Sequence, residues 1–425
     1  MRTAINLDDL DLFLNERRKG FLLERVTLHD AKGWVVEHGI LKHRTGGFFN
    51  VVGVNFESGE DRIFLYQPQS AVTGLLTSSF DGQWHVLMQA RAEPGTQGTA
   101  QYGPTIQSTL ANYLGLHGGR PAAYTDHFIR YQSSVRRVIH DSEQLDLGER
   151  YLHKSKRLAI LECDPDIEVA DGYIWVPEKL IRESVTLSYF LNTDLRALLA
   201  VFPWEGEPGI ESSLVPACQL VRESLTRPID PNVIGAICAK LSARVRHGNF
   251  KELSDLENWN ISGNGFFEKK TLQGFAIEFY YCEATGREAR SWFQPLVNSR
   301  GTGYAALYCR EVGGALEVLV RIGSESGLKT GHALLPTVLD YPDCTRTMRP
   351  APGKVLLSTM ESDEGGRFRH DLSRYELVLV PRDYGLADDL FWVSISELKW
   401  FLSNSNLCSI QLRGLSSMLL GELPC

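Results

Sequence analysis

The sequence predicts an α+β protein built from two consecutive copies of one module. Two observations predict this class. Blocks of the first half recur in the same order in the second half, and segments with strand periodicity alternate with helix signals in both halves. A stretch rich in Pro, Gly and Glu, residues 202–216, separates the halves and has the composition of a linker. We therefore expect an N-terminal module over residues 1–205 and a C-terminal module over residues 206–425.

The repeat is carried by four ordered blocks, and within three of them several positions share one offset. Constant offsets within ordered blocks indicate a duplication rather than a chance match. The matched positions are Trp34 with Trp259 (offset 225), Gly47–Phe48 with Gly274–Phe275 and Gln67–Pro68 with Gln294–Pro295 (227), Val86–Leu87, Glu93, Gly95 and Pro104–Thr105 with Val318–Leu319, Glu325, Gly327 and Pro336–Thr337 (232), and Arg150, Arg157, Trp175 and Arg196 with Arg367, Arg374, Trp392 and Arg413 (217).

The two copies differ in length at one place. The first copy has 45 residues from Thr105 to Arg150, whereas the second has 30 from Thr337 to Arg367. The 15 additional residues fall where the first copy carries N-Y, H-G-G and Y-T-D-H-F. This difference favours one working site in the N-terminal module and a degenerate site in the C-terminal module; the alternative is a first-half loop that is merely longer.

Several elements of the first half are predicted from local signals. Leu10, Phe13 and Leu14 have the spacing of a short amphipathic helix. The runs at residues 48–56, 63–69 and 157–163 are rich in β-branched, aromatic and leucine residues, as strands are. Pro177 is suited to open a helix, and Asn192 is suited to N-cap the next one.

The strand predicted at residues 84–93 carries a polar row. Alternation directs Trp84, Val86, Met88, Ala90 and Ala92 to one face and His85, Leu87, Gln89, Arg91 and Glu93 to the other. Polar groups two residues apart are separated by roughly 7 Å, which suits a ligand with many hydroxyls and phosphates. The alternative is a half-solvated strand with ordinary surface charges.

Composition and motifs exclude several classes of protein. A net charge of −8 offers no basic surface for nucleic acid. The N-terminus has no signal-like run, and no stretch has the length of a membrane span. The eight cysteines form no C-x-x-C pair, which favours reduced thiols in a cytoplasmic protein. Since no metal motif, P-loop, Rossmann fingerprint or nucleophile elbow occurs, we expect neither a bound metal nor a cofactor.

Long motifs relate the chain to a known family. They are Q-A-R-A-E-P-G (89–95), P-T-I-Q-S-T-x-x-N-Y (104–113), H-G-G (117–119), S-E-Q (142–144), N-T-D-L-R (192–196), R-E-A-R-S-W-F-Q-P-L (287–296), E-G-G-R-F (364–368) and the terminal L-R-G-L-S-S. With these motifs the chain resembles the nucleotide-diphosphate-hexose 2,3-dehydratases of deoxysugar biosynthesis. It departs from the family pattern at Thr96 and Leu339 and by a short insertion after S-E-Q, which bears on the substrate more than on the reaction.

The resemblance implies a fold and an assembly. It implies a homodimer of chains that each contain two Nudix-like modules, with mixed sheets flanked by helices. Neither half contains a Nudix box. Metal-dependent hydrolysis of a pyrophosphate is therefore not expected.

The resemblance also implies a reaction. Water is removed across carbons 2 and 3 of a 4-keto-6-deoxyhexose linked to a nucleoside diphosphate, usually dTDP, and no redox cofactor is needed. The product is a 3,4-diketo-2,6-dideoxy sugar, which a downstream 3-ketoreductase could take up. The rival interpretations are an isomerase or epimerase of the same keto sugar, and a nucleotide-sugar-binding protein without catalysis.

Residues of the family motifs in the first half are the candidate site. Glu93 or His117 is the expected base, and Tyr113 and Tyr124 are the candidate donors to the ketone or the leaving hydroxyl. Each has an ordinary alternative, as a solvated turn carboxylate, a structural histidine or a packed ring. The remaining candidates bind substrate: Gln89, Gln107 and Asn112 the sugar hydroxyls, Arg91 the diphosphate, and His85 from the same strand face. Because the Gln-Pro pair of Gln67 recurs, a role in the fold is favoured for it.

Overall fold

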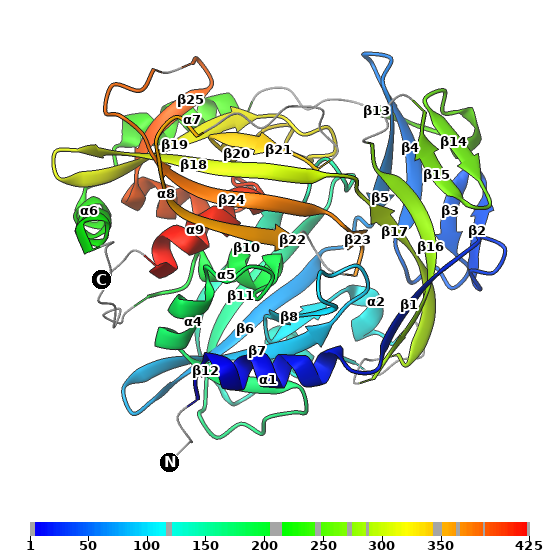
Figure 1. Cartoon of the computed structure of the whole chain (residues 1–425), viewed down its shortest axis with the longest axis horizontal. Helices are drawn as coiled ribbons and strands as arrows, with labels where there is room; N and C mark the ends of the chain where they lie inside the picture. Colours follow the sequence, from blue (N-terminus) through cyan, green and yellow to red (C-terminus); the bar gives the residue numbers. More distant parts are fainter. Residues whose placement is uncertain are drawn as a thin grey trace.

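The structure is a computed structural model that describes residues 5–115, 121–204, 215–242, 248–269, 274–285, 289–342, 351–362, 366–385 and 387–422. Its strands form two large and two small sheets, and helices lie among them (Figure 1). The mixed α+β class is therefore confirmed. The large sheets lie one above the other with helices between them, and the small sheets lie together at one end (Figure 1).

The first large sheet belongs to the N-terminal half and has the order β10-β11-β6-β7-β12, with β8 beside β7 and β9 beside β6. β11 runs parallel to β6, and the other pairs are antiparallel. Helices α1 (Leu7–Arg18), α4 (Glu178–Ser184) and α5 (Thr193–Leu199) cover one face. The strands are β6 (Ala71–Phe80), β7 (Gln83–Ala92), β8 (Ala100–Gly103), β9 (Ile106–Ser108), β10 (Val135–Leu145), β11 (Ser155–Cys163) and β12 (Tyr173–Pro177).

The second large sheet, in the C-terminal half, has an equivalent order, β22-β24-β18-β19-β20, with β21 beside β18 and β25 beside β19. Its single parallel pair, β18 and β24, corresponds to β6 and β11. The strands are β18 (Thr302–Val312), β19 (Ala315–Gly323), β20 (Ala333–Pro336), β21 (Val338–Asp340), β22 (Lys354–Ser362), β24 (Leu372–Leu379) and β25 (Leu390–Ser394), and the helices are α6 (Val215–Thr226), α7 (Pro231–Leu241), α8 (Ile395–Ser403) and α9 (Ile410–Glu422).

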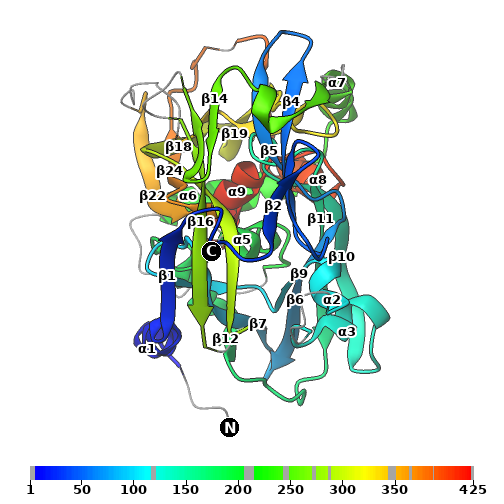
Figure 2. The same cartoon turned by 90° about the vertical axis from the view of Figure 1, so that its right-hand side faces the viewer.

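Each small sheet receives one strand from the other half. β1 (Phe21–Val26) pairs with β16 of the C-terminal half (Figure 2), and β13 (Gly248–Lys251) pairs with β4 of the N-terminal half (Figure 1). The small sheets also share one core, which includes Trp34, Phe49 and Phe279. Their other strands are β2 (Trp34–Glu37), β3 (Ile40–His43), β4 (Asn50–Phe56) and β5 (Asp61–Tyr66), and β14 (Trp259–Ser262), β15 (Gly265–Glu268), β16 (Ala276–Ala284), β17 (Ser291–Asn298) and β23 (Phe368–Arg369).

Repeated residues make the same contacts in the two halves. The Thr105 hydroxyl donates to Leu87 O at 2.5 Å and accepts from Leu76 N. The Thr337 hydroxyl makes the same bonds to Leu319 and Tyr308, each 232 residues later. The Pro-Thr repeat therefore serves the fold in both halves, by joining the two central strands of each large sheet.

The predicted helix signals act as expected. Leu10 and Leu14 are buried on one side of α1. Asn192 caps α5, and its side chain accepts a hydrogen bond from Leu195 N at 2.9 Å. Pro177 directly precedes α4.

β7 shows the predicted alternation. The apolar set from Trp84 to Ala92 enters the core beneath α1 and α5. On the opposite face Leu87 is also buried, in a cluster with Ile106 and Phe128. In the polar row, His85 and Gln89 are half-buried, whereas Arg91 and Glu93 at its end are buried and face a cavity rather than bulk solvent.

Other predictions concern the linker, the thiols and the membrane. Most of the predicted linker, residues 205–214, lies outside the described residues. The described cysteines form no disulfide, and all but Cys238 are buried. Within the described ranges no helix is long and apolar enough to cross a membrane.

Candidate active site

A cavity of about 310 Å³ opens between the N-terminal large sheet and the two small sheets. Sites for small molecules usually have about 300–1,000 Å³. Both halves of the chain line it. The first half contributes β7, β9 and the loop after β5, and the second half contributes β17 and residues 366–367.

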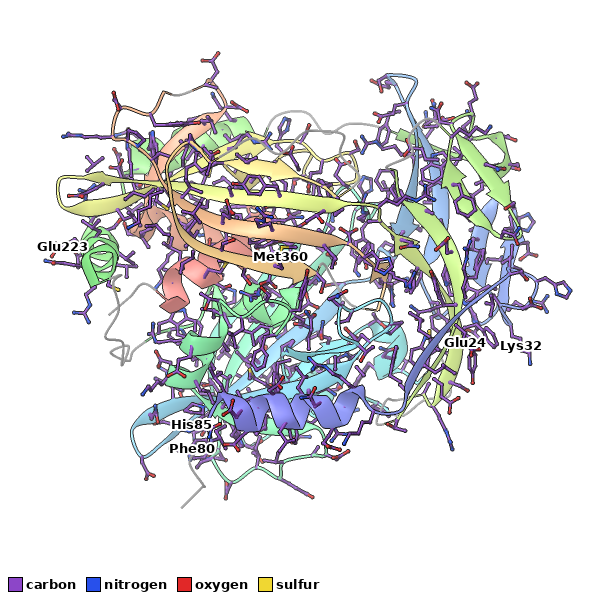
Figure 3. The ribbon with its side chains drawn as sticks, in the orientation of Figure 1. Glu24, Lys32, Phe80, His85, Glu223 and Met360 are labelled. Atoms are coloured by element: carbon purple, nitrogen blue, oxygen red, sulfur yellow. The ribbon has the colours of Figure 1, made fainter. Side chains whose placement is uncertain are left out.

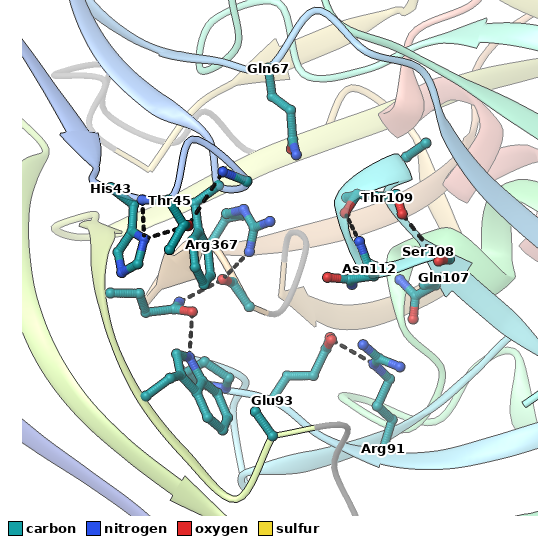
Figure 4. Close-up of a pocket in the computed structure, with 18 of the residues that line it drawn as sticks. His43, Thr45, Gln67, Arg91, Glu93, Gln107, Ser108, Thr109, Asn112 and Arg367 are labelled. Atoms are coloured by element: carbon teal, nitrogen blue, oxygen red, sulfur yellow. Dashed lines mark hydrogen bonds and ion pairs between the residues drawn. The ribbon is translucent and has the colours of Figure 1, made fainter. Parts of the chain in front are cut away.

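Glu93 and Arg91 form an ion pair at the end of β7. Arg91 Nε lies 2.6 Å from Glu93 Oε1, and the side chains are only 6% and 8% exposed. The strand stops at Pro94, and Gly95 then turns the chain with a φ of +87°. A Cβ on Gly95 would lie 1.8 Å from Phe368 O, so only glycine allows this close approach. The tight turn holds the Glu93 carboxylate toward the cavity (Figure 4).

The segment that packs against this turn comes from the second half. Gly366 N donates to Pro94 O at 3.0 Å, and Arg367 follows on the cavity wall. The Arg367 guanidinium carbon lies 4.6 Å from the centre of the Phe49 ring. Its Nε is buried and bonds to no described residue, which leaves a donor for a ligand anion.

Two lysines line the cavity together with Asp194. Lys156 Nζ lies 2.7 Å from Asp194 Oδ1 and 3.2 Å from Asp146 Oδ2, and Lys154 Nζ lies 3.5 Å from that same Asp146 oxygen. The second oxygen of Asp194 accepts a hydrogen bond from Gln107. All four charged side chains are almost fully buried.

The electrostatics of the cavity favour an anionic ligand. Burial tends to raise the pKa of Asp146, but the ammonium groups of Lys156 and Lys154 outweigh it and lower that pKa. The described lining side chains comprise five cations, Lys32, Arg91, Lys154, Lys156 and Arg367, and two carboxylates, Glu93 and Asp194, a formal charge of +3. A diphosphate would therefore be attracted even though the whole chain carries −8.

One part of the cavity wall is aromatic. His43 and Phe48 have ring centroids 4.6 Å apart, and burial lowers the pKa of His43, so its ring is neutral near pH 7. Trp292 and Phe293 of β17 also line the cavity. Such a wall is suited to stacking on a planar ring.

Four predicted site residues lie on this cavity. They are Arg91, Glu93, Gln107 and Asn112, and the structure brings them together from β7, β9 and α2 (Leu110–Tyr113) (Figure 4). Gln89 stands one step behind, where its Oε1 accepts a hydrogen bond from Arg91 at 3.1 Å.

The other predicted residues lie elsewhere. Tyr113 and Tyr124 border a separate and more open concavity of about 470 Å³. The Tyr124 hydroxyl donates to Glu168 O there and accepts from Ala170 N. His85 packs against Phe80, at the opposite end of the molecule from Lys32 of the cavity (Figure 3). His117 lies outside the described residues.

An equivalent region beside the second large sheet is filled by side chains from both halves. Arg150, the repeat of Arg367, lies 3.3 Å from Asp371 and is 2% exposed. Glu325, the repeat of Glu93, accepts hydrogen bonds from the Tyr341 hydroxyl and Gly148 N. The counterparts of Arg91, Gln107, Lys154, Lys156 and Asp194 are Gly323, Leu339, Asp371, Ser373 and Gln411.

Sequence reasoning missed the site residues that lie outside β7 to α3 (Thr125–Arg130). Signals for them were present. Asp194, Trp292, Gln294 and Arg367 belong to the family motifs quoted above. Lys154 and Lys156 are positively charged in the first copy, whereas the residues 217 positions later in the second copy are not. A comparison of charge between the copies would have revealed them.

The described residues include no group of three or more His, Cys, Asp or Glu side chains arranged to hold a metal ion. Instead, Arg91 pairs with Glu93, and Lys154 and Lys156 pair with neighbouring aspartates. Acid–base and electrostatic chemistry is what they can supply.

Comparison with known proteins shows the family of the chain. The sequence model of the NDP-hexose 2,3-dehydratase family matches residues 9–202 and 239–419. Similar proteins include three named dTDP-4-dehydro-6-deoxy-alpha-D-glucopyranose 2,3-dehydratase. That of Streptomyces violaceoruber is 32% identical over 424 residues, covering 93% of this chain and 92% of its own length. Those of Saccharopolyspora spinosa and Amycolatopsis orientalis are 28% and 27% identical, covering 89% and 96% of this chain and 83% and 89% of their own lengths.

Proposed function

The chain belongs to the NDP-hexose 2,3-dehydratase family, and we propose that it removes water across carbons 2 and 3 of dTDP-4-keto-6-deoxyglucose. The observation that carries the proposal is the cavity itself. It combines a carboxylate held by an arginine, a pair of buried lysines and a surplus of positive charge, and it is large enough for a small molecule.

The reaction needs a base at carbon 3, a hydrogen-bond donor at the ketone oxygen and an acid at the carbon 2 hydroxyl. The 4-ketone acidifies the hydrogen on carbon 3, and a base removes that proton to form an enolate. The electrons of the enolate then expel the carbon 2 hydroxyl, which takes up a proton and leaves as water. The resulting enol tautomerises to the 3,4-diketo-2,6-dideoxy sugar, so the step is redox-neutral.

Glu93 is the base that we propose. It is carried into the cavity by the Pro94–Gly95 turn, and Arg91 fixes its carboxylate. Arg91, predicted to bind the diphosphate, is engaged by Glu93 and Gln89 and would serve as a positioning residue. His117 stays the rival for the base.

The lysine pair would stabilise the enolate. A buried ammonium group beside a developing oxyanion is worth far more than one in water, because little solvent screens it. Lys154 and Lys156 already neutralise Asp146, and Asp194 orients Lys156. Gln107 and Asn112 would bind hydroxyls of the sugar.

The nucleotide would occupy the rest of the cavity. Arg367, with an unused Nε, is the proposed partner of the diphosphate. The aromatic wall at His43, Phe48 and Trp292 would stack on the nucleobase of the nucleotide.

We further propose that the two halves are repeats of one Nudix-like module. The equivalent strand orders, the matching parallel pairs and the shared Pro-Thr hydrogen bonds support the duplication. A homodimer, and a downstream 3-ketoreductase that consumes the unstable diketone, are also proposals, which follow from the family resemblance. A cytoplasmic location is proposed as well, since described cysteines that are mostly buried and form no disulfide fit a reducing compartment.

Incubation with dTDP-4-keto-6-deoxyglucose, with and without a 3-ketoreductase, tests the function. Mass analysis should show the loss of one water from the sugar. A product of unchanged mass would instead indicate an isomerase or epimerase, and saturable binding without turnover would indicate a binding protein.

A further inference from the structure

Gln67 has a buried polar group that bonds to no residue in the described part of the chain. The residue follows β5, and its side chain reaches into the cavity from the side opposite Glu93 (Figure 4). It is only 5% exposed, and its Oε1 is buried without a hydrogen bond from any described residue. Leaving a buried carbonyl without a hydrogen bond destabilises the fold, so such groups are normally paired.

The repeat supplies an internal comparison. Gln294 occupies the same position in the second half, 227 residues later, and uses both ends of its amide. Its Nε2 donates to Gly366 O at 2.7 Å, and its Oε1 accepts from Trp292 Nε1 at 2.7 Å. The residue that corresponds to Trp292 is Leu65, whose side chain has no donor. The Gln-Pro pair therefore serves the fold in one copy and leaves a free acceptor in the other.

Strand pairing places Gln67 near the proposed reaction end of the cavity. Leu65 N donates to Arg150 O at 2.9 Å, and Leu152 N donates to Leu65 O at 3.0 Å. The segments that contain Leu65 and Tyr151 run parallel at this bridge, so Gln67 lies alongside the segment that reaches Lys154. A sugar ring between Gln67 and Glu93 would meet an amide on one side and a carboxylate on the other.

We propose that Gln67 binds the hexose of the substrate and that its Oε1 accepts a hydrogen bond from a sugar hydroxyl. The proposal rests on the proposed function for the identity of the ligand. A hydroxyl is the donor that a hexose offers, and a buried acceptor that is left unpaired without it discriminates strongly between ligands. Gln67 is thereby a residue that distinguishes the nucleotide sugar from the nucleotide alone.

Titration calorimetry with two ligands tests the assignment. dTDP-glucose carries the hexose but lacks the 4-ketone, and dTDP lacks the hexose. In Gln67→Met, which preserves the length of the side chain, we expect dTDP-glucose to bind about ten-fold more weakly and dTDP to bind as in the wild type. Unchanged affinity for dTDP-glucose, or an equal loss for both ligands, would overturn the proposal.

Thermal unfolding separates binding from a role in the fold. Gln67→Met removes no hydrogen bond among described residues and should melt at or above the wild-type temperature. Gln294→Met removes two and should melt lower. A Gln67→Met protein that melts as low as Gln294→Met would make Gln67 a scaffold residue. Gln67→Leu provides a second variant with the same expected results.

The proposed reaction and the role of Gln67 can fail separately. Wild-type protein that binds dTDP-glucose but removes no water from the 4-keto sugar refutes the dehydration alone. Water loss by the wild type, together with equal ligand affinities in Gln67→Met and wild type, refutes the role of Gln67 alone.

Discussion

Replacing Glu93 with Gln removes the proposed base and keeps the shape of the side chain. A positioned base contributes a factor on the order of 10²–10⁴, so kcat should fall by about that factor. Removing one partner of a buried ion pair costs about 3–5 kcal/mol of unfolding free energy. Here the new amide oxygen still accepts from Arg91, which also donates to Gln89, so the loss of stability should stay below that range.

Hydrogen exchange at carbon 3 isolates the step that Glu93 performs. In D2O, reversible formation of the enolate introduces deuterium at carbon 3 of the keto sugar, and mass or NMR analysis detects it in substrate left unconverted. Glu93→Gln should lose both this exchange and the release of water. dTDP should still bind with nearly wild-type affinity, because the cations of the cavity remain.

Glu325→Gln is the matched control. Glu325 occupies the same repeat position as Glu93, but it lies in the filled region and accepts hydrogen bonds from Tyr341 and Gly148. Its replacement should leave turnover unchanged. If Glu93→Gln exchanges carbon 3 hydrogen at the wild-type rate, the base lies elsewhere, and His117 becomes the next residue to replace.

Three further predictions concern the cavity and its filled counterpart. Lys156→Met should lower kcat by about 10²–10³ with little change in dTDP affinity, because it removes a cation beside the enolate. Stopped-flow kinetics measure the turnover and calorimetry measures the affinity. A kcat within two-fold of the wild type, which is a change of roughly 0.4 kcal/mol in the activation free energy, would contradict the role of Lys156 in stabilising the enolate. Arg367→Gln should weaken dTDP binding about ten-fold or more and flatten the salt dependence of that binding. Arg150→Gln should instead lower the melting temperature, because it leaves Asp371 buried without its cation. The reverse pattern would reject Arg367 as the partner of the diphosphate. Burial, with help from Glu149, raises the pKa of Glu325 from 4.5 to about 7. The folded state therefore holds a proton that the unfolded chain loses above pH 4.5, and the stabilising contribution of Glu325 should be full below that pH and vanish as pH rises through 7; melting temperatures of wild type and Glu325→Gln that differ equally at pH 5 and pH 8 would contradict this.

The sequence was sufficient to predict elements that local signals govern. The alternation in β7 reflects a period of two that any half-buried strand must obey, and the Asn192 cap depends on one side chain and the next helical turn. Arg91, Glu93, Gln107 and Asn112 could be predicted as a group because they lie close together along the chain.

The rest of the site depends on pairing between distant segments. Arg367 reaches the cavity because residues near 366 pack on the Glu93 turn, more than 270 residues away in sequence. Periodicity cannot reveal that contact, nor the exchange of β1 and β13 between the small sheets. Tyr113 and Tyr124 are instead close to the site residues in sequence but do not line the cavity. They are near Gln107 in sequence, yet Tyr113, which follows the cavity residue Asn112 on α2, borders the other concavity together with Tyr124.

Both halves contribute residues to the open cavity and to the filled region, so neither region belongs to a single module. Each potential site lies between a large sheet of one half and the segments that the other half lays against it. The open cavity therefore needs Gln294 and Arg367 from the second half. The filled region, in turn, is occupied by Arg150 from the first half, which meets Asp371 where the open cavity has Lys154. Arg150 lies in the same half of the sequence as Glu93, the proposed catalytic base. A substitution at Arg150 should nevertheless affect the filled region beside the other large sheet. A substitution in either half can therefore alter the region beside the large sheet of the other half.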